Sequence, residues 1–506
     1  MKLTMKKLAY LMAGLLSAGL LTSCGNDWLD LEPSTAIPTE EANKTFSEIE
    51  FSLNGIYHSM AGSDAYSGRL MYYGDVTGDD MQAVSSTCRT GNYYSINWTA
   101  NTGPTSHWRE LYSIIQSCNL ILTKIDHINV LEDDENEKIY RDDLKGQALT
   151  IRGLALFDLT KLYGYTYLRN NGASLGVPII TEVSNEVNSA KPSRNTVAQC
   201  YTAFIQDLKD GADLLHPGYY WAEDNLNSQE RIINRKGKIS KWAALTLLSR
   251  AYLYMGKDPE ALQAAEDAIA GAEADGYKLW TREEYPTAWA QDASSQAPGE
   301  LLFELVNLTT DSPGNESMGY LNSADGYEDM CITASFYQHM MQTPDDIRIR
   351  LFAPDGEDVI YLNKYQPQEG ESIEDANIPM VRLSESYLNA AEAAVKTGDR
   401  TKTEFYYKAI AQRANPNAVI PADITLDDVL EERRKELIGE GQRMFDLLRN
   451  DKSVKRIDIT DDAMGDIEHF AETMEFDRNY YRSVLPVPQR EINSNPNIQQ
   501  TPEYLQ

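Results

Sequence analysis

Apolar residues recur at steps of three and four positions over most of the chain, with polar and charged residues between them. This period matches one face of an α-helix, and such a face packs against a protein core. Stretches with this period cover residues 46–60, 108–125, 140–163 and 197–215. The pattern predicts a mainly α-helical protein with few short strands.

Two further stretches share one register of large and small residues. In Trp242–Ala268, large residues come first, Gly256 falls at a turn, and alanines follow at 261, 265 and 268. The stretch from Ser384 to Ile410 repeats this order, with Gly398 at its turn. The offsets fit the tetratricopeptide (TPR) repeat of roughly 34 residues, in which small residues let paired helices cross closely. Generic alanine-rich hairpins are the alternative, and the recurring turn glycine favours TPR-like units.

Two long stretches, Gly62–Gly103 and Trp280–Tyr337, lack helical periodicity and are rich in Gly, Ser, Asn and Asp. Long stretches of this kind inside compact chains are usually functional loops or disordered segments. We expect both to be irregular, apart from a short strand at Leu301–Leu305.

The C-terminal part contains one more helix signal. Thr425 and Asp428 have the spacing of a capping box, and the apolar positions after them predict a helix through Leu448. From Leu485 to Tyr504 we expect extended chain, because proline cannot continue a helix.

The N-terminus has the pattern of an export signal. Lysines at positions 2, 6 and 7 precede an apolar run over 8–21, which is shorter than the roughly 20 residues that span a bilayer. The run ends in Leu21-Thr22-Ser23-Cys24, which resembles a bacterial lipobox. We therefore expect residues 1–23 to be removed and Cys24 to carry acyl chains that anchor the protein stably in a membrane. An ordinary signal peptide with an incidental cysteine is the alternative.

Composition narrows the function classes. Of 506 residues, 42% are hydrophobic, and the net charge is −31. A surface this acidic repels nucleic-acid phosphates, so neutral ligands or basic partners fit better. The remaining cysteines are far apart and form no CxxC pair, so buried free thiols are favoured over disulfides at Cys88, Cys118, Cys200 and Cys331.

Several motifs together resemble the SusD/RagB family, the surface lipoproteins that capture nutrients in Bacteroidota. The similar features are Cys24 with Trp28-Leu29-Asp30 and Pro33, Trp108–Asn119, Arg382–Ala393, Glu432–Arg449 and Pro486–Pro496. They lie in the family's order and span essentially the whole mature chain. The departures are small: Val487 stands where Ile is common, and Gln499-Gln500 replaces Gln-Asn.

The resemblance implies a single domain over about 24–506, with an N-terminal half to about 230 and a C-terminal half from about 300. Its implied fold is a set of four TPR-like helix pairs that carry an irregular, ligand-facing half. It also implies attachment to the outer membrane at the cell surface, and a partner, a SusC-like TonB-dependent transporter. Family members bind oligosaccharides or, in RagB-type systems, peptides, and they are not enzymes.

Aromatic and Asn side chains in the two irregular stretches suggest a glycan site, because flat rings stack on the C–H faces of sugars. The predicted ligand-binding residues are Trp98, Tyr94, Tyr93, Asn97, Asn101, Trp289, Tyr285, Trp280, Tyr320 and Tyr327. Trp98 is the strongest candidate. The alternative is that an aromatic residue only anchors its loop, which we expect for about half of them.

Charged residues suggest no catalysis. Glu436 and Glu440 lie near Arg433 and Arg443 on one predicted helix, which favours a structural ion-pair network. Carboxylates within 74–80 could ligate calcium, but the EF-hand spacing is absent and a solvated turn is expected. No cofactor is expected, and no nucleophile elbow, P-loop or HExxH motif occurs. The helix pairs alone would also suit an envelope scaffold that binds only proteins.

Overall fold

The computed structural model describes residues 42–129, 135–183, 191–217, 237–290, 299–356, 358–459 and 464–505. The predicted signal peptide and Cys24 lie outside these ranges. No helix of the described residues is long and apolar enough to cross a membrane.

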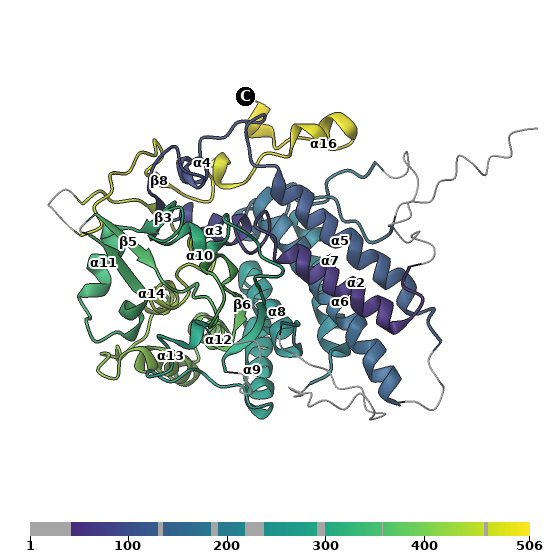
Figure 1. The fold of residues 1–506 in the computed structure, drawn as a ribbon, viewed down its shortest axis with the longest axis horizontal. Helices are drawn as coiled ribbons and strands as arrows, with labels where there is room; N and C mark the ends of the chain where they lie inside the picture. The colour runs from purple at the N-terminus through teal and green to yellow at the C-terminus, as the bar shows by residue number, and fades with distance from the viewer. Residues whose placement is uncertain are drawn as a thin grey trace, which may run out of the picture.

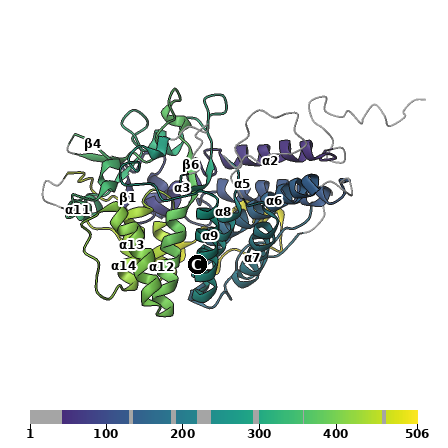
Figure 2. The ribbon, with the colours of Figure 1, turned by 90° about the horizontal axis from the view of Figure 1, so that it is seen from below.

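A continuous array of long helices runs across the molecule, from the right of Figure 1 to its lower left. The helices are α2 (Phe46–Met60), α5 (Ser106–Ile125), α6 (Glu135–Tyr163), α7 (Val197–Leu214), α8 (Lys241–Met255), α9 (Asp258–Ala274), α12 (Leu383–Thr397), α13 (Arg400–Ala414) and α14 (Leu426–Glu436). From α5 to α9 each helix packs on the next, and α9 packs on α12 and α12 on α13. Figure 2 shows α7, α8, α9, α12 and α13 lying side by side. The mainly α-helical prediction is confirmed.

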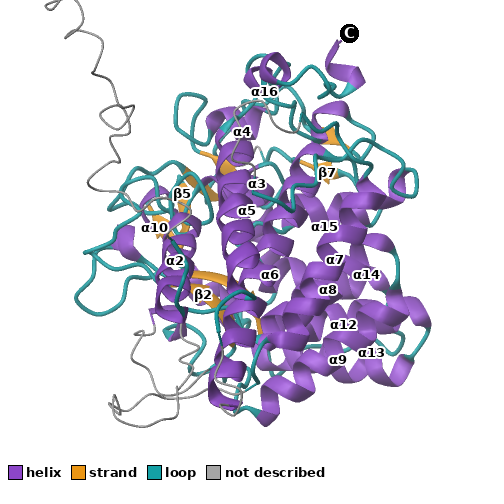
Figure 3. Cartoon of the chain, turned by 90° about the vertical axis from the view of Figure 1, so that its right-hand side faces the viewer, coloured by secondary structure: helices purple, strands orange, loops and turns teal. Residues whose placement is uncertain are grey.

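The TPR-like pairs are confirmed at α8–α9 and α12–α13. Gly256 and Gly398 end the first helix of each pair with φ of +68° and +79°, a conformation that L side chains rarely adopt. Ala251, Ala261 and Ala391 are buried, and their small side chains let neighbouring helices approach closely. These pairs stack in the helical layer that Figure 3 shows in purple.

The two stretches expected to be irregular contain more structure than predicted. Their elements are α3 (Arg69–Val76), β1 (Met81–Ala83), α4 (Gly91–Ser95), η3 (Ala288–Ala290), β2 (Leu301–Leu305), α10 (Met318–Leu321), β3 (Met330–Ile332) and α11 (Ala334–Met341). The predicted strand β2 is confirmed. The others are short, and short elements are stabilised by tertiary packing more than by their own periodicity.

The C-terminal helix prediction was too long. The capping box at Thr425 is present and opens α14, but α14 ends at Glu436 and a separate helix, α15 (Arg443–Arg449), follows. Gly439 and Gly441 have φ of +79° and +71° between them, so the chain turns there. A Cβ on Gly441 would lie 2.7 Å from the Met71 carbonyl oxygen, so glycine lets this turn pack against α3. The predicted extended end is likewise interrupted by α16 (Gln489–Ser494).

The strands form four two-stranded antiparallel sheets in the described part of the chain. The pairs are β1–β3, β2–β6 (Ile378–Arg382), β4 (Phe352–Asp355) with β5 (Val359–Leu362), and β7 (Val454–Lys455) with β8 (Glu475–Phe476). Short 3-10 helices occur at η2 (Tyr167–Arg169), η4 (Ile347–Leu351), η5 (Ile373–Asp375), η6 (Tyr481–Ser483) and η7 (Pro502–Leu505). In β1–β3, Met81 pairs with Ile332, so the two irregular stretches lie side by side.

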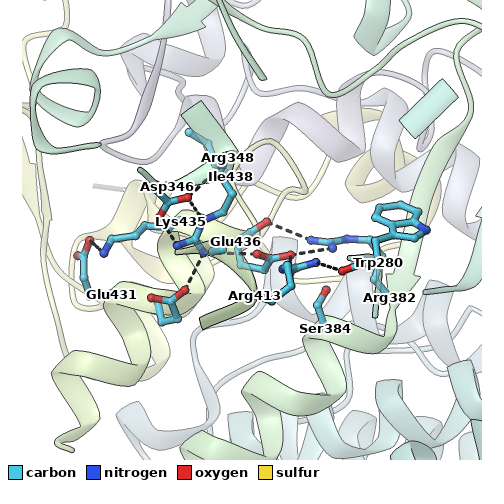
Figure 4. A network of polar contacts seen from close by, with 12 residues as sticks. Trp280, Asp346, Arg348, Arg382, Ser384, Arg413, Glu431, Lys435, Glu436 and Ile438 are labelled. Carbon is cyan, nitrogen blue, oxygen red and sulfur yellow. Dashed lines mark hydrogen bonds and ion pairs between the residues drawn. The ribbon is translucent and has the colours of Figure 1, made fainter. Parts of the chain in front are cut away.

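A buried ion-pair network connects α14 to the rest of the C-terminal half (Figure 4). Glu436 is 0% exposed, and its Oε1 accepts from Arg382 Nη1 at 3.0 Å and from Arg413 Nη2 at 2.6 Å. Arg348 Nη1 lies 3.4 Å from Oε2. Burial raises the pKa of Glu436, but Arg413, Arg382 and Arg348 more than offset it and hold the pKa at about 2.

Glu440 belongs to the same network. Its Oε1 accepts from Arg382 Nη2 at 2.6 Å and from Lys364 Nζ at 2.8 Å. Arg382 also binds the buried carboxylate of Glu300. Each carboxylate is therefore bound by buried cations, which confirms the predicted structural ion pairs. The expected partners were wrong, because Arg433 binds Asp446 and Arg443 binds Asp79.

We predict that Glu436→Gln lowers the free energy of unfolding by about 3–5 kcal/mol, because buried arginines lose their counter-charge. A depressed carboxyl pKa stabilises the fold above the unfolded-state value of about 4.3. That stabilisation is lost as the pH falls toward 2, so the variant should show a weaker acid dependence. Urea unfolding from pH 7 to pH 3 measures both effects. The exposed Glu369→Gln is the control, and an equally small change in both variants would contradict the prediction.

Candidate functional site

Six of the aromatic residues predicted to bind ligand are buried in the core. Trp98 stacks on Tyr73, with ring centroids 6.2 Å apart, and Arg456 lies over the ring of Tyr94 at 4.0 Å. Trp289 packs between Trp280 and the cations Lys364 and Arg382. The buried residues are Tyr93, Tyr94, Trp98, Trp280, Tyr285 and Trp289. The structure therefore corrects the expectation that these rings, Trp98 first, present faces to a ligand.

The prediction of exposed rings was wrong because the surrounding sequence, rich in Gly, Ser and Asn, is typical of binding loops and of anchored loops alike. Such loops need large side chains to attach them to the core, and these six rings serve as the attachment. Six of the eight predicted aromatic residues are therefore loop anchors, more than the half that was expected. Asn97 and Asn101 are exposed in the turn before α5, and their role in binding stays a prediction.

We predict that Trp98→Ala destabilises the fold by about 3–5 kcal/mol, the usual range for removing a buried tryptophan. The exposed neighbour Asn97→Ala should change stability by less than about 0.5 kcal/mol. Urea denaturation followed by tyrosine and tryptophan fluorescence gives both values. Wild-type stability in Trp98→Ala would show that the ring does not anchor its loop.

The carboxylates considered for calcium are buried, which corrects the expected solvated turn. Gly441 N donates to Asp75 Oδ2 at 2.6 Å, Arg443 Nε donates to Asp79 at 2.6 Å, and Arg434 Nε donates to Asp80 at 2.8 Å. Each carboxylate is thus bound by at least one protein donor, although the buried Asp75 Oδ1 accepts no hydrogen bond from the described residues. In the described part of the chain, no group of three or more His, Cys, Asp or Glu side chains is placed to hold a metal ion.

The buried carboxyl of Asp75 makes the stability of the fold depend on pH. Burial raises its pKa to about 7, although the Gly441 N–H and Lys364 lower it. Because the folded-state pKa exceeds the unfolded value of about 3.9, the stability from protonated Asp75 is present below that value and is lost as pH rises toward 7. Asp75→Asn keeps an acceptor for Gly441 and removes the titration.

We expect the difference in unfolding free energy, wild type minus Asp75→Asn, to fall between pH 4 and pH 7, by at most about 1.4 kcal/mol per pH unit. Urea unfolding over this range measures it. Parallel curves for the two proteins would contradict the buried titration.

Two of the predicted aromatic residues lie instead on an exposed surface at α10 and the loop before α4. We call it the Tyr–Arg surface and define it by Asp64, Arg69, Arg89, Arg109, Glu316, Tyr320 and Tyr327. The ring of Tyr327 is 38% exposed and meets the Tyr320 ring edge-to-face, with centroids 4.9 Å apart. The Arg89 guanidinium lies over the Tyr327 ring, 3.5 Å from its centroid. Two predicted ligand residues, Tyr320 and Tyr327, thus lie together in this surface.

A tight turn holds the two tyrosines in place. Ser317 caps α10 by accepting from Tyr320 N, and the Tyr320 carbonyl accepts from Tyr327 N at 2.8 Å. A Cβ on Gly326 would lie 1.9 Å from the Tyr320 carbonyl oxygen, so only glycine fits. The backbone therefore sets the edge-to-face geometry of the pair.

The buried Asp329 brings Arg89 to the tyrosines. The Asp329 carbonyl accepts from Thr90 Oγ1 at 2.7 Å and from Val84 N at 3.0 Å. Its Oδ1 accepts from Arg89 N at 3.3 Å. Burial raises the pKa of this carboxyl, and the contacts with Arg89 act in the opposite direction. These contacts extend the β1–β3 pairing by a few residues. They fix the Arg89 backbone, from which its side chain reaches the tyrosines.

Ion pairs extend the surface toward α5. Glu316 lies between Arg69 and Arg89, and Asp64 lies between Arg69 and Arg109. No sequence pattern indicated that these five charged residues belong to a binding surface. The motif around Trp108 includes Arg109, but no sequence signal linked Arg89 to residues more than 200 positions away.

The four cysteines of the described chain are free, which confirms the prediction of free thiols, but Cys88 is half-buried where a buried thiol was expected. Cys88 donates to the Asp329 carbonyl at 3.2 Å beneath the Tyr–Arg surface, and Cys118, Cys200 and Cys331 are buried.

Comparison with known families and structures identifies the chain. The model of the SusD family matches residues 356–504, and a model described as starch-binding associating with outer membrane matches residues 27–253. SusD-like protein P38 of Formosa agariphila is 23% identical, covering 97% of each chain.

Two solved structures are more similar. A Bacteroides vulgatus ATCC 8482 protein, whose name describes it as a candidate sugar-binding protein, is 57% identical with a TM-score of 0.85. The match covers 91% of this chain and 99% of that protein. A SusD superfamily protein of Bacteroides thetaiotaomicron is 33% identical, covers 90% of this chain and 100% of that one, and has a TM-score of 0.80. The resemblance of motifs is thereby confirmed, and the chain belongs to the SusD family.

Proposed function

We propose that the protein is a non-catalytic nutrient-binding lipoprotein that captures glycans at the Tyr–Arg surface. The carrying observation is an exposed tyrosine ring with a guanidinium on one side and carboxylates around it. The protein would be anchored at the cell surface through Cys24 and would deliver its ligand to a SusC-like TonB-dependent transporter of the outer membrane. The family and the sugar-binding description of the similar Bacteroides vulgatus protein support this proposal.

The chemistry of the surface suits a sugar. A tyrosine ring offers a flat apolar face for polarised C–H groups. Sugar hydroxyls both donate and accept, and the half-exposed Arg89 and Glu316 supply a donor and an acceptor beside the ring. Stacking by Arg89 also keeps the Tyr327 ring in one orientation, so less entropy is lost on binding.

A peptide ligand, as in RagB-type systems, is the second candidate. Arginine and carboxylate side chains would serve a peptide backbone as well as a sugar, and the binding test includes peptides for this reason. A scaffold that binds only proteins is less well supported, because the exposed tyrosines belong to α10 and the loop after it and not to the TPR-like helix pairs.

We predict that Tyr327→Ala weakens binding of the best polysaccharide by about tenfold or more, equal to about 1.4 kcal/mol. Tyr327→Phe keeps the stacking face and should bind within about threefold of wild type, about 0.7 kcal/mol on the same scale. Isothermal calorimetry on a glycan found by array screening gives the constants. The control is Phe405→Ala, which removes another exposed ring (62%) on α13.

Equal binding by wild type and Tyr327→Ala would exclude the Tyr–Arg surface as the glycan site. Binding to peptides with none to glycans would favour the RagB-type function. Protection from protease on intact cells would contradict surface exposure, and Cys24→Ala should release the protein from the membrane fraction.

A further inference from the structure

We propose that the Tyr–Arg surface selects neutral glycans over glycans that carry carboxylate or sulfate groups, and that Glu316 imposes this selection. The inference rests on the proposed function and adds the chemical class of its ligand. It is carried by the way in which carboxylates occupy every arginine of the surface.

Glu316 binds two of the three arginines at once. Its Oε2 accepts from Arg69 Nη2 at 2.6 Å, and its Oε1 lies 3.5 Å from Arg89 Nε. A guanidinium binds anions through its planar fork of N–H groups, and Glu316 takes part of the fork of both arginines. The Glu316 side chain is 39% exposed, so its negative charge also faces an incoming ligand.

The remaining side of the surface follows the same arrangement. Asp64 binds Arg69 and also accepts from Arg109 Nη2 at 2.9 Å. Arg109 Nε donates to Glu110 at 2.6 Å. The buried Asp329 adds a fourth carboxylate, 3.6 Å from Arg89. Three arginines therefore face four carboxylates, in a chain whose net charge is −31.

This balance penalises an anionic glycan. A uronate or sulfate group that accepts from these arginines would lie beside the carboxylate of Glu316 or Asp64, whether it displaced that carboxylate or took a remaining N–H. Like charges placed close together repel and lower the affinity for the anionic ligand. Protein interfaces exclude unsuitable partners in the same way. The negative field of the whole protein also slows the approach of a polyanion.

A neutral sugar meets no such penalty. A hydroxyl can accept from a free N–H of Arg89 and donate to Glu316 while the ion pair stays intact. No buried charge has to be uncovered, and the C–H face of the sugar can contact the part of Tyr327 that Arg89 leaves exposed. The paired charges thus act as fixed donors and acceptors for hydroxyl groups.

The test compares two classes of polysaccharide by affinity gel electrophoresis at 150 mM NaCl with the full mature chain. The neutral probes are amylopectin, galactomannan and laminarin, and the anionic probes are polygalacturonate and chondroitin sulfate. We expect the wild type to be retarded by at least one neutral probe and by neither anionic probe.

The variant Glu316→Gln keeps an acceptor for Arg69 and removes the charge. We expect the ratio of anionic to neutral affinity to rise at least tenfold, and the gained binding to weaken as NaCl increases from 50 to 500 mM because salt screens exposed charges. The matched control is Glu260→Gln, an equal charge change at an exposed position in α9, which should leave the ratio unchanged.

Wild-type retardation by polygalacturonate or chondroitin sulfate that Arg89→Ala abolishes would overturn the inference and leave glycan capture in place. An unchanged ratio in Glu316→Gln, with circular dichroism showing a folded protein, would overturn the role of Glu316. Absence of binding to every probe would overturn both the selection and the proposed function.

Discussion

The buried carboxylate of Glu436 is the constraint on which the C-terminal half depends. Arg382 at the end of β6, Arg413 at the end of α13 and Arg348 in η4 all converge on it. None of these guanidinium groups could stay in the interior without a counter-charge, because an unpaired buried charge costs several kcal/mol. The network therefore fixes how the strand, the TPR-like pair and α14 meet (Figure 4).

The helical layer and the irregular half have separate tasks. Alanine-rich contacts between helices build a rigid support, whereas buried rings such as Trp98 and Trp289 attach the loops to it. Rigid attachment matters because a binding surface on loops is only as well defined as the anchors beneath it. With most of the rings used in this way, the described chain leaves Tyr320 and Tyr327 at the Tyr–Arg surface.

Arginine–carboxylate pairing occurs in both places with different consequences. Around Glu436 the pairs are shielded from water, so their loss affects the fold. Around Glu316 the pairs are half-exposed and contribute little to stability. There they decide which donors and acceptors a ligand meets, and the same chemistry that holds the interior together can set selectivity at the surface.

The sequence by itself determined most of the long helices, the TPR-like turns at Gly256 and Gly398 and the capping box at Thr425. These features depend on residues close in the chain, where period and spacing are sufficient evidence. Only the tertiary structure decided that Trp98 is buried. It also decided that Arg89 lies on Tyr327, because the β1–β3 pairing joins segments that are far apart in sequence. Exposure and long-range pairing come from packing, which local patterns do not encode.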